Sequence, residues 1–183
     1  MDCFERGIER KNTNCDKWDA PFVKEGVVPM WVADMDFEVA PAITRRLVLA
    51  AGKGAFGYQF LSDHYYDAVI HFMKERHDYP VEKDWICYVP NVVLGLFAGL
   101  QAVTEKGDEV IIQTPVYGSF FKVVRESGRI LTESPLKNED GYYTMDFEDL
   151  EKKITEKTKA MLICNPHNPS GRVWKEEELE RLV

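Results

Sequence analysis

The sequence predicts an α/β fold of three layers, αβα, in which helices cover both faces of a mostly parallel sheet. Three observations predict it. Short apolar runs alternate with helical stretches from residue 85 onward. Turn-forming residues separate these elements, and no repeat or low-complexity tract interrupts them. With 183 residues, 45% of them apolar, the chain is also long enough to bury a core.

Residues 1–40 are expected to form an irregular N-terminal arm, and residues 41–183 the N-terminal part of a larger domain. Pro41 suits the first position of a helix over 41–51, and Ser62 can cap a helix that ends near residue 78. The expected strands are 86–89, 110–113, 129–135 and 160–164, and the expected helices are 93–103, 118–126, 147–154 and 175–183. The last helix lacks a stop signal, which favours a truncated chain.

Charge and composition exclude several classes of partner. The formal net charge is −8, and no cluster of Lys and Arg reverses it locally, so nucleic acid is not an expected partner. No apolar stretch approaches the roughly 20 residues of a membrane helix, and no signal peptide is visible, so we expect a cytoplasmic protein without a membrane partner. The four cysteines form no C-x-x-C pair, and no metal site is expected.

Three loops are expected to meet at one edge of the sheet. They are residues 90–93, 114–117 and 165–171, which follow predicted strands. Together they offer a helix N-terminus for a phosphate, the ring of Tyr117, and amide and imidazole groups, which suits a flat aromatic cofactor that carries a phosphate. Each feature also has a simpler interpretation: Asn91 as a helix cap, Tyr117 as an ordinary core or surface tyrosine, and N-P-H-N-P as a rigid turn.

Four motifs carry a resemblance to a known family. They are NPHNPSGRVW at 165–174, GDEVIIQTPVYGSF at 107–120, PMWVADMDF at 29–37 and GAFGYQ at 54–59. Together they resemble the class I/II aminotransferases, a fold type I superfamily that depends on pyridoxal 5'-phosphate (PLP), and within it the cystathionine β-lyases of the PatB/MalY type. The resemblance implies that residues 41–183 are an incomplete PLP-binding large domain, and that the arm contributes to a small domain and the substrate side.

The resemblance also assigns roles at the cofactor. Asn168 would donate a hydrogen bond to the phenolic oxygen of PLP and help to hold the substrate carboxylate. Tyr117 would stack on the pyridine ring, and the backbone N–H groups of Val92 and Val93 would bind the phosphate. Relatives usually carry Gly where this chain has Asn91, and Asn tolerates the left-handed backbone region better than most residues do.

Further roles are implied for the N-terminal arm and its surroundings. Tyr58 would reach the cofactor phosphate of a neighbouring subunit, which implies a homodimer. Ala33 and Asp34 would line the substrate side of the site, where a small amino-acid substrate binds.

The implied function is a PLP-dependent carbon–sulfur β-lyase when the protein is complete. PLP chemistry requires a lysine, and the family places this lysine beyond residue 183. The 183-residue chain alone is therefore expected to be inactive. Two alternatives stay open: an aminotransferase on the same fold, and a non-catalytic remnant or interaction module.

Overall fold

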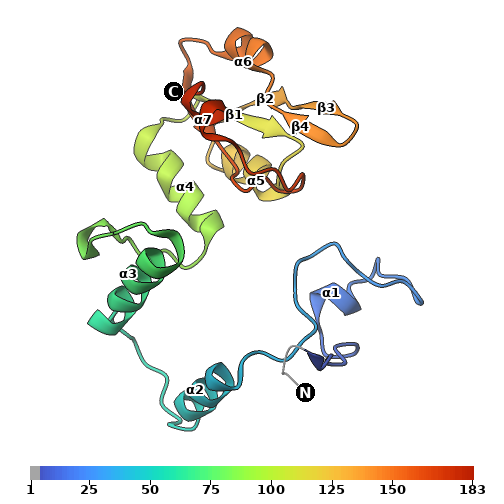
Figure 1. Ribbon diagram of the computed structural model, residues 1–183, viewed down its shortest axis with the longest axis vertical. Helices are drawn as coiled ribbons and strands as arrows, with labels where there is room; N and C mark the ends of the chain where they lie inside the picture. The colour runs from blue at the N-terminus through green and yellow to red at the C-terminus, as the bar shows by residue number, and fades with distance from the viewer. Residues whose placement is uncertain (1–4) are drawn as a thin grey trace. The chain divides into compact units, whose positions relative to one another are not determined.

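The computed structural model describes residues 5–183. The chain forms two compact units, which divide between Tyr65 and Tyr66 (Figure 1). None of the helices in the described range combines the length and apolar character that crossing a bilayer requires. The division differs in position from the predicted end of the arm at residue 40, and that boundary stays a prediction.

The first unit contains two helices, α1 (Asp16–Asp19) and α2 (Pro41–Ala51). As predicted, α2 begins with proline at its first turn, where the missing N–H costs no hydrogen bond. None of its side chains is buried. Its apolar side chains therefore face solvent in this structure, and the exposed ones include Ile43, Leu47, Val48 and Leu49.

Helix α3 (Asp63–His77) crosses the division between the units and agrees with the predicted helix. A 3-10 helix follows over Lys83–Trp85. The predicted strand at 86–89 is wrong, since those residues have no regular secondary structure. A strand is defined by its pairing, and an apolar run alone does not supply a neighbouring strand.

The sheet of the second unit has the order β2-β1-β5, and both pairings are parallel. Its strands are β1 (Glu109–Thr114), β2 (Ile130–Pro135) and β5 (Thr158–Leu162). The central strand, β1, is covered on both faces, since Val110, Ile111 and Ile112 are at most 1% exposed. Burial on both faces explains why this strand is a continuous apolar run without alternation.

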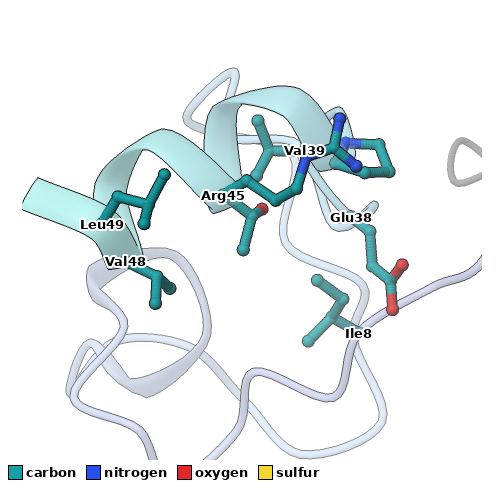
Figure 2. Close-up of a pocket in the computed structure, with 8 residues that line it drawn as sticks. Ile8, Glu38, Val39, Arg45, Val48 and Leu49 are labelled. Carbon is teal, nitrogen blue, oxygen red and sulfur yellow. The ribbon is translucent and has the colours of Figure 1, made fainter. Parts of the chain in front are cut away.

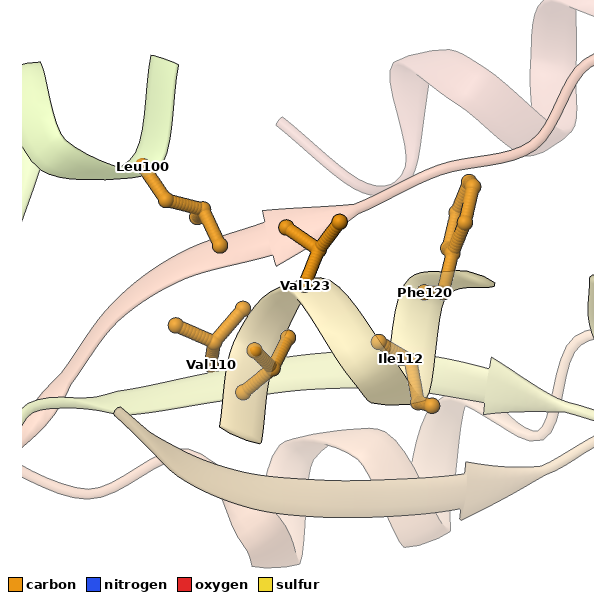
Figure 3. Close-up of a cluster of buried hydrophobic side chains, with 6 residues drawn as sticks. Leu100, Val110, Ile112, Phe120 and Val123 are labelled. Atoms are coloured by element: carbon orange, nitrogen blue, oxygen red, sulfur yellow. The ribbon is translucent and has the colours of Figure 1, made fainter. Parts of the chain in front are cut away.

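Helices cover both faces of this sheet, as predicted. On one face, α4 (Val92–Val103) and α5 (Gly118–Glu126) pack against the sheet and against each other. On the other face lies α6 (Phe147–Lys153), whose Asp149 accepts a hydrogen bond of 2.8 Å from Ser134 of β2. Figure 3 shows the main core on the first face, between β1 and the two helices. Its buried members are Leu100, Val110, Ile112, Phe120, Val123 and Val124.

A hairpin and a short helix complete the second unit. The hairpin joins β3 (Lys137–Glu139) and β4 (Tyr142–Thr144), and α7 spans Glu176–Glu180. At the turn, Asp140 and Gly141 adopt φ of 51° and 90°. Asp-Gly is a strong hairpin signal, and it was the sequence feature that could have predicted these two strands.

Candidate functional site

Two of the three predicted loops follow neighbouring parallel strands and so leave the sheet at the same edge. Ile112 of β1 pairs with Leu162 of β5. Tyr117 lies five residues beyond the first of these, and Asn168 lies six residues beyond the second. The carboxyl edge of a parallel sheet is where α/β proteins bind ligands.

The third loop begins helix α4. A short connection joins the end of α4 to the start of β1, and α4 packs against α5 and β5. The helix therefore runs back along the sheet, with its N-terminus directed toward the carboxyl edge. This arrangement supports the predicted meeting of the three loops, although residues 86–89 are not a strand.

Asn91 is the N-cap of α4. Its side-chain oxygen accepts the N–H of Leu94 at 2.9 Å, and its backbone oxygen accepts the N–H of Gly95 at 3.1 Å. Its φ is −162°, which is extended backbone, so the left-handed conformation considered for this position is not used. The N–H groups of Val92 and Val93 belong to the first turn, where a helix has no internal acceptors for them. Capping by Asn91 thus satisfies the N–H of Leu94 and is compatible with the predicted binding of a phosphate by Val92 and Val93.

Tyr117 immediately precedes α5, and its backbone oxygen accepts the N–H of Phe120 at 2.9 Å. The residue is 48% exposed. Tyr117 is therefore not a core tyrosine, and its exposed half is accessible to a ligand; the interpretation as a surface tyrosine stays open.

The loop after β5 holds Asn168 outward by means of buried neighbours. Asn168 is exposed, and its backbone N–H donates to the thiol of Cys164 at 3.3 Å. His167, the residue before it, is only 2% exposed. The ring of Trp174, which is 4% exposed, contacts the His167 ring edge to face at 5.4 Å and donates to the carbonyl of Cys164 at 2.9 Å.

The backbone of the same loop closes on His167. The His167 N–H donates to the carbonyl of Arg172 at 2.6 Å, and the Gly171 N–H donates to the His167 carbonyl at 2.7 Å. Gly171 adopts φ of 73°, a conformation that favours glycine. Arg172 is held in turn by the carbonyl of Tyr143 and the carboxylate of Glu178. The N-P-H-N-P motif is therefore a rigid turn, and it is also one that presents an exposed amide.

Burial determines the charge state of His167. Removal from water lowers the pKa of its imidazole, and the backbone of Gln113 opposes this effect in part. The imidazole is therefore uncharged at neutral pH. The sequence analysis noted an imidazole in this loop but assigned it no role, and a histidine between two prolines gives no signal of burial.

The predicted substrate-side residues lie in the first unit, in a loop held by ion pairs. Ala33 and Asp34 are exposed, and the Asp34 carboxylate contacts the guanidinium of Arg10 at 3.1 Å. The neighbouring Asp36 accepts hydrogen bonds from Lys17 Nζ at 2.7 Å and Trp18 Nε1 at 2.8 Å. These bonds, the one from Lys17 first, hold the pKa of Asp36 below its usual range. Asp36 therefore anchors the loop.

Tyr58 is fully exposed in a segment without regular structure. Together with Ala33 and Asp34 it belongs to the first unit, whereas Val92, Val93, Tyr117 and Asn168 belong to the second. The structure therefore has four of the predicted cofactor residues in one unit, and the roles of all seven residues stay predictions.

The structure also contains two apolar grooves, one in each unit. Figure 2 shows an apolar groove of about 720 Å³ in the first unit, between α2 and the segment around Ile8 and Glu38. A second groove, of about 540 Å³, runs along α4 and the free side of β5. Val92 lines this second groove, but Tyr117 and Asn168 do not, so neither cavity defines the cofactor site.

Comparison with known proteins decides the family. The model of the aminotransferase class I and II family matches residues 27–183. The chain belongs to this family. Among curated members, it is 43% identical to cystathionine beta-lyase PatB of Bacillus subtilis (strain 168), over 98% of this chain and 47% of the relative. It is 31% identical to the protein MalY of Escherichia coli (strain K12), over 97% of this chain and 47% of MalY.

Comparison with solved structures supports the same assignment. Cystalysin from Treponema denticola, which contains a PLP cofactor, superposes with a TM-score of 0.86 at 40% identity, over 97% of this chain and 46% of cystalysin. A PLP-bound C–S lyase from Staphylococcus hominis gives 0.85 at 34% identity, over 98% and 46%. The predicted αβα fold of fold type I enzymes is confirmed. The chain spans about half the length of the relatives it matches.

Proposed function

We propose that the complete protein is a PLP-dependent carbon–sulfur β-lyase that cleaves cystathionine or a similar β-thio amino acid to pyruvate, ammonia and a thiol. The observation that carries the proposal is the 43% identity to a cystathionine beta-lyase along 98% of the chain. The 183-residue segment, which covers less than half of that relative, is expected to be inactive alone.

The residues at the carboxyl edge fit PLP. The first turn of α4 offers N–H groups and the positive end of a helix dipole to the phosphate. The exposed part of Tyr117 offers a flat apolar surface to the pyridine ring, and the exposed amide of Asn168 offers a donor to the phenolic oxygen. PLP, when bound, supplies an electron-withdrawing ring that stabilises negative charge on the Cα of an amino acid.

This chain's own residues would act by binding and orientation. The α4 N-terminus fixes one end of the cofactor, Asn168 fixes the opposite side, and Tyr117 restricts the ring to one plane. Asn168 would also hold the substrate carboxylate, with Ala33 and Asp34 on the substrate side. Such positioning sets the angle between the scissile bond and the ring, and this angle decides which bond is weakened.

The test is a product assay on the complete protein loaded with PLP. With L-cystathionine, we expect pyruvate and thiol to be formed in equal amounts. Their formation should continue without added keto acid. Product formation that requires a keto acid, with no free thiol, would contradict the lyase and identify an aminotransferase. Asn168→Ala should reduce turnover at least tenfold, since it removes contacts to both cofactor and substrate.

An aminotransferase is the second candidate. One structure supports it: a PLP-bound putative aminotransferase from Clostridium difficile 630 superposes with a TM-score of 0.87 at 38% identity. The same binding residues would serve either reaction, and the product assay separates them.

We further propose a cytoplasmic homodimer in which Tyr58 reaches the phosphate bound by the partner. The full exposure of Tyr58 supports a role outside its own unit. The test mixes Tyr58→Phe with a second inactive variant, changed at the PLP-bearing lysine. Recovery of activity in hybrid dimers is expected, because one of the two shared sites would then have both groups intact. Hybrids that stay inactive, with both parents dimeric, would contradict the shared site.

A further inference from the structure

The buried ring of His167, next to Asn168, contacts Ser170 and Trp174. Its ring Nδ1 lies 2.9 Å from Ser170 Oγ, and the Arg172 N–H also points at this oxygen, at 3.4 Å. In the tautomer with the ring hydrogen on Nε2, the Ser170 hydroxyl accepts from the Arg172 N–H and donates to Nδ1; in the other tautomer Nδ1 donates to the hydroxyl, and either way the ring is tied to Ser170.

The other ring nitrogen, Nε2, is buried and has no hydrogen-bond partner within residues 5–183. The polar contact that fixes the ring is therefore the one between Nδ1 and Ser170, inside the loop that carries Asn168.

We propose that His167 is a positioning residue that fixes the direction of Asn168 within the loop after β5, and so sets the strength of the Asn168 contact with the cofactor. The inference rests on the proposed function. His167 is buried and is not assigned a contact with PLP. It acts through three links: Ser170 on one side of the ring, Trp174 against the ring, and the backbone bonds that close the loop. These links add to the bond from the Asn168 N–H to Cys164 in restricting the direction of the exposed Asn168.

The variant that tests this is His167→Phe in the complete protein. Phenylalanine keeps an aromatic ring against Trp174 but removes both ring nitrogens, so the loop keeps its packing and loses its polar links. We expect PLP to dissociate about tenfold more readily, which corresponds to the loss of about one hydrogen bond. The matched control is His71→Phe, a change of the same kind at an exposed position of α3.

The spectrum of the bound cofactor is the second readout. A donor to the phenolic oxygen stabilises its anionic form, so weakening that donor should raise the pH midpoint of the visible absorption band. His167→Phe and Asn168→Ala should shift this midpoint in the same direction. A loss of fold stability alone would lower the unfolding temperature and leave the midpoint unchanged.

A double-mutant cycle completes the test. If His167 acts through Asn168, His167→Phe should weaken PLP binding about tenfold in the natural background and less than twofold in the Asn168→Ala background. Equal effects in both backgrounds, or no effect in the natural one, would overturn the inference. If Asn168→Ala itself leaves PLP binding unchanged, the proposed cofactor site fails as well, and the two failures are distinguishable. Should His167→Phe not fold, Ser170→Ala removes one link and should give the same shift at about twofold to fivefold.

Discussion

Asn91 offers a direct test of where the cofactor phosphate binds. The residue caps α4 through its side-chain oxygen, which accepts the Leu94 N–H at 2.9 Å. Aspartate caps a helix as well as asparagine does and adds only a negative charge. Asn91→Asp should therefore keep the stability of the unliganded protein within about 0.5 kcal/mol, or raise it through the helix dipole. The same change would place a carboxylate beside any anion at the first turn.

The size of the effect follows from Coulomb's law. If the phosphate binds the N–H groups of Val92 and Val93, its nearest oxygens lie about 5–6 Å from the new carboxylate. Two unit charges at that separation repel by about 3 kcal/mol at an effective dielectric constant near 20. Partial screening by solvent reduces this to about 2 kcal/mol, a loss of about thirtyfold in PLP affinity.

The assays are urea unfolding of the unliganded protein and titration of PLP by its visible absorption. Asn91→Ala should behave in the opposite way: it loses the cap, which costs about 1 kcal/mol of stability, and adds no charge against the phosphate. Gln101→Glu is the charge control, since it adds one negative charge about 15 Å away along the same helix. If Asn91→Asp folds normally and binds PLP within threefold of the natural protein, the phosphate is not at α4.

Three further outcomes are expected. Burial lowers the pKa of His167 in the folded protein below its pKa in the unfolded chain. The contribution of His167 to stability is therefore complete above pH about 6.5 and is lost as the pH falls toward the folded-state pKa. The urea midpoint of unfolding should decrease from pH 7 to pH 5, and it should decrease less in His167→Phe. Tyr117→Ala should weaken PLP binding about tenfold and Tyr117→Phe less than threefold, if ring stacking and not the hydroxyl matters; equal losses in a PLP titration would contradict this. Asp36→Asn leaves one acceptor oxygen for two donors, Lys17 and Trp18. Limited proteolysis should therefore cut the N-terminal arm of the variant faster than that of the natural protein. An unchanged cleavage rate would contradict the anchoring role.

The regular elements of the second unit could be predicted because their signals are local. Helix α5 was predicted with its observed bounds, since turn residues flank it on both sides. The cap of α6 is local too: Asp146, directly before the helix, accepts the N–H of Asp149 at 3.2 Å. The strand predicted at 86–89 was wrong for the opposite reason. Its apolar residues match a strand, but a strand also needs a pairing partner, which lies elsewhere in the sequence. The sequence near the segment holds no information about that partner.

The candidate site shows the same division between local and distant information. Tyr117 and Asn168 could be identified from motifs, and both are exposed, so packing does not explain why these residue types are present. Asp36 lies in the motif at 29–37, yet its contacts depend on Lys17 and Trp18, which lie outside that motif. A motif marks the whole segment, and only the structure separates the residues that touch a ligand from those that hold the segment in place.

The distinction between residues that contact a ligand and residues that support them explains how such a site keeps its geometry. Tyr117 and Asn168 come from different loops, and a misplacement of about 1 Å between binding groups is enough to cost a large factor in rate. Exposed side chains cannot fix themselves to that tolerance, so the precision has to come from buried links between the loops. In this chain the proposed link is the buried, uncharged ring of His167, which joins the loop after β5 to Trp174. An uncharged link holds two segments together at little desolvation cost, whereas a buried ion there would add a field next to a charged cofactor.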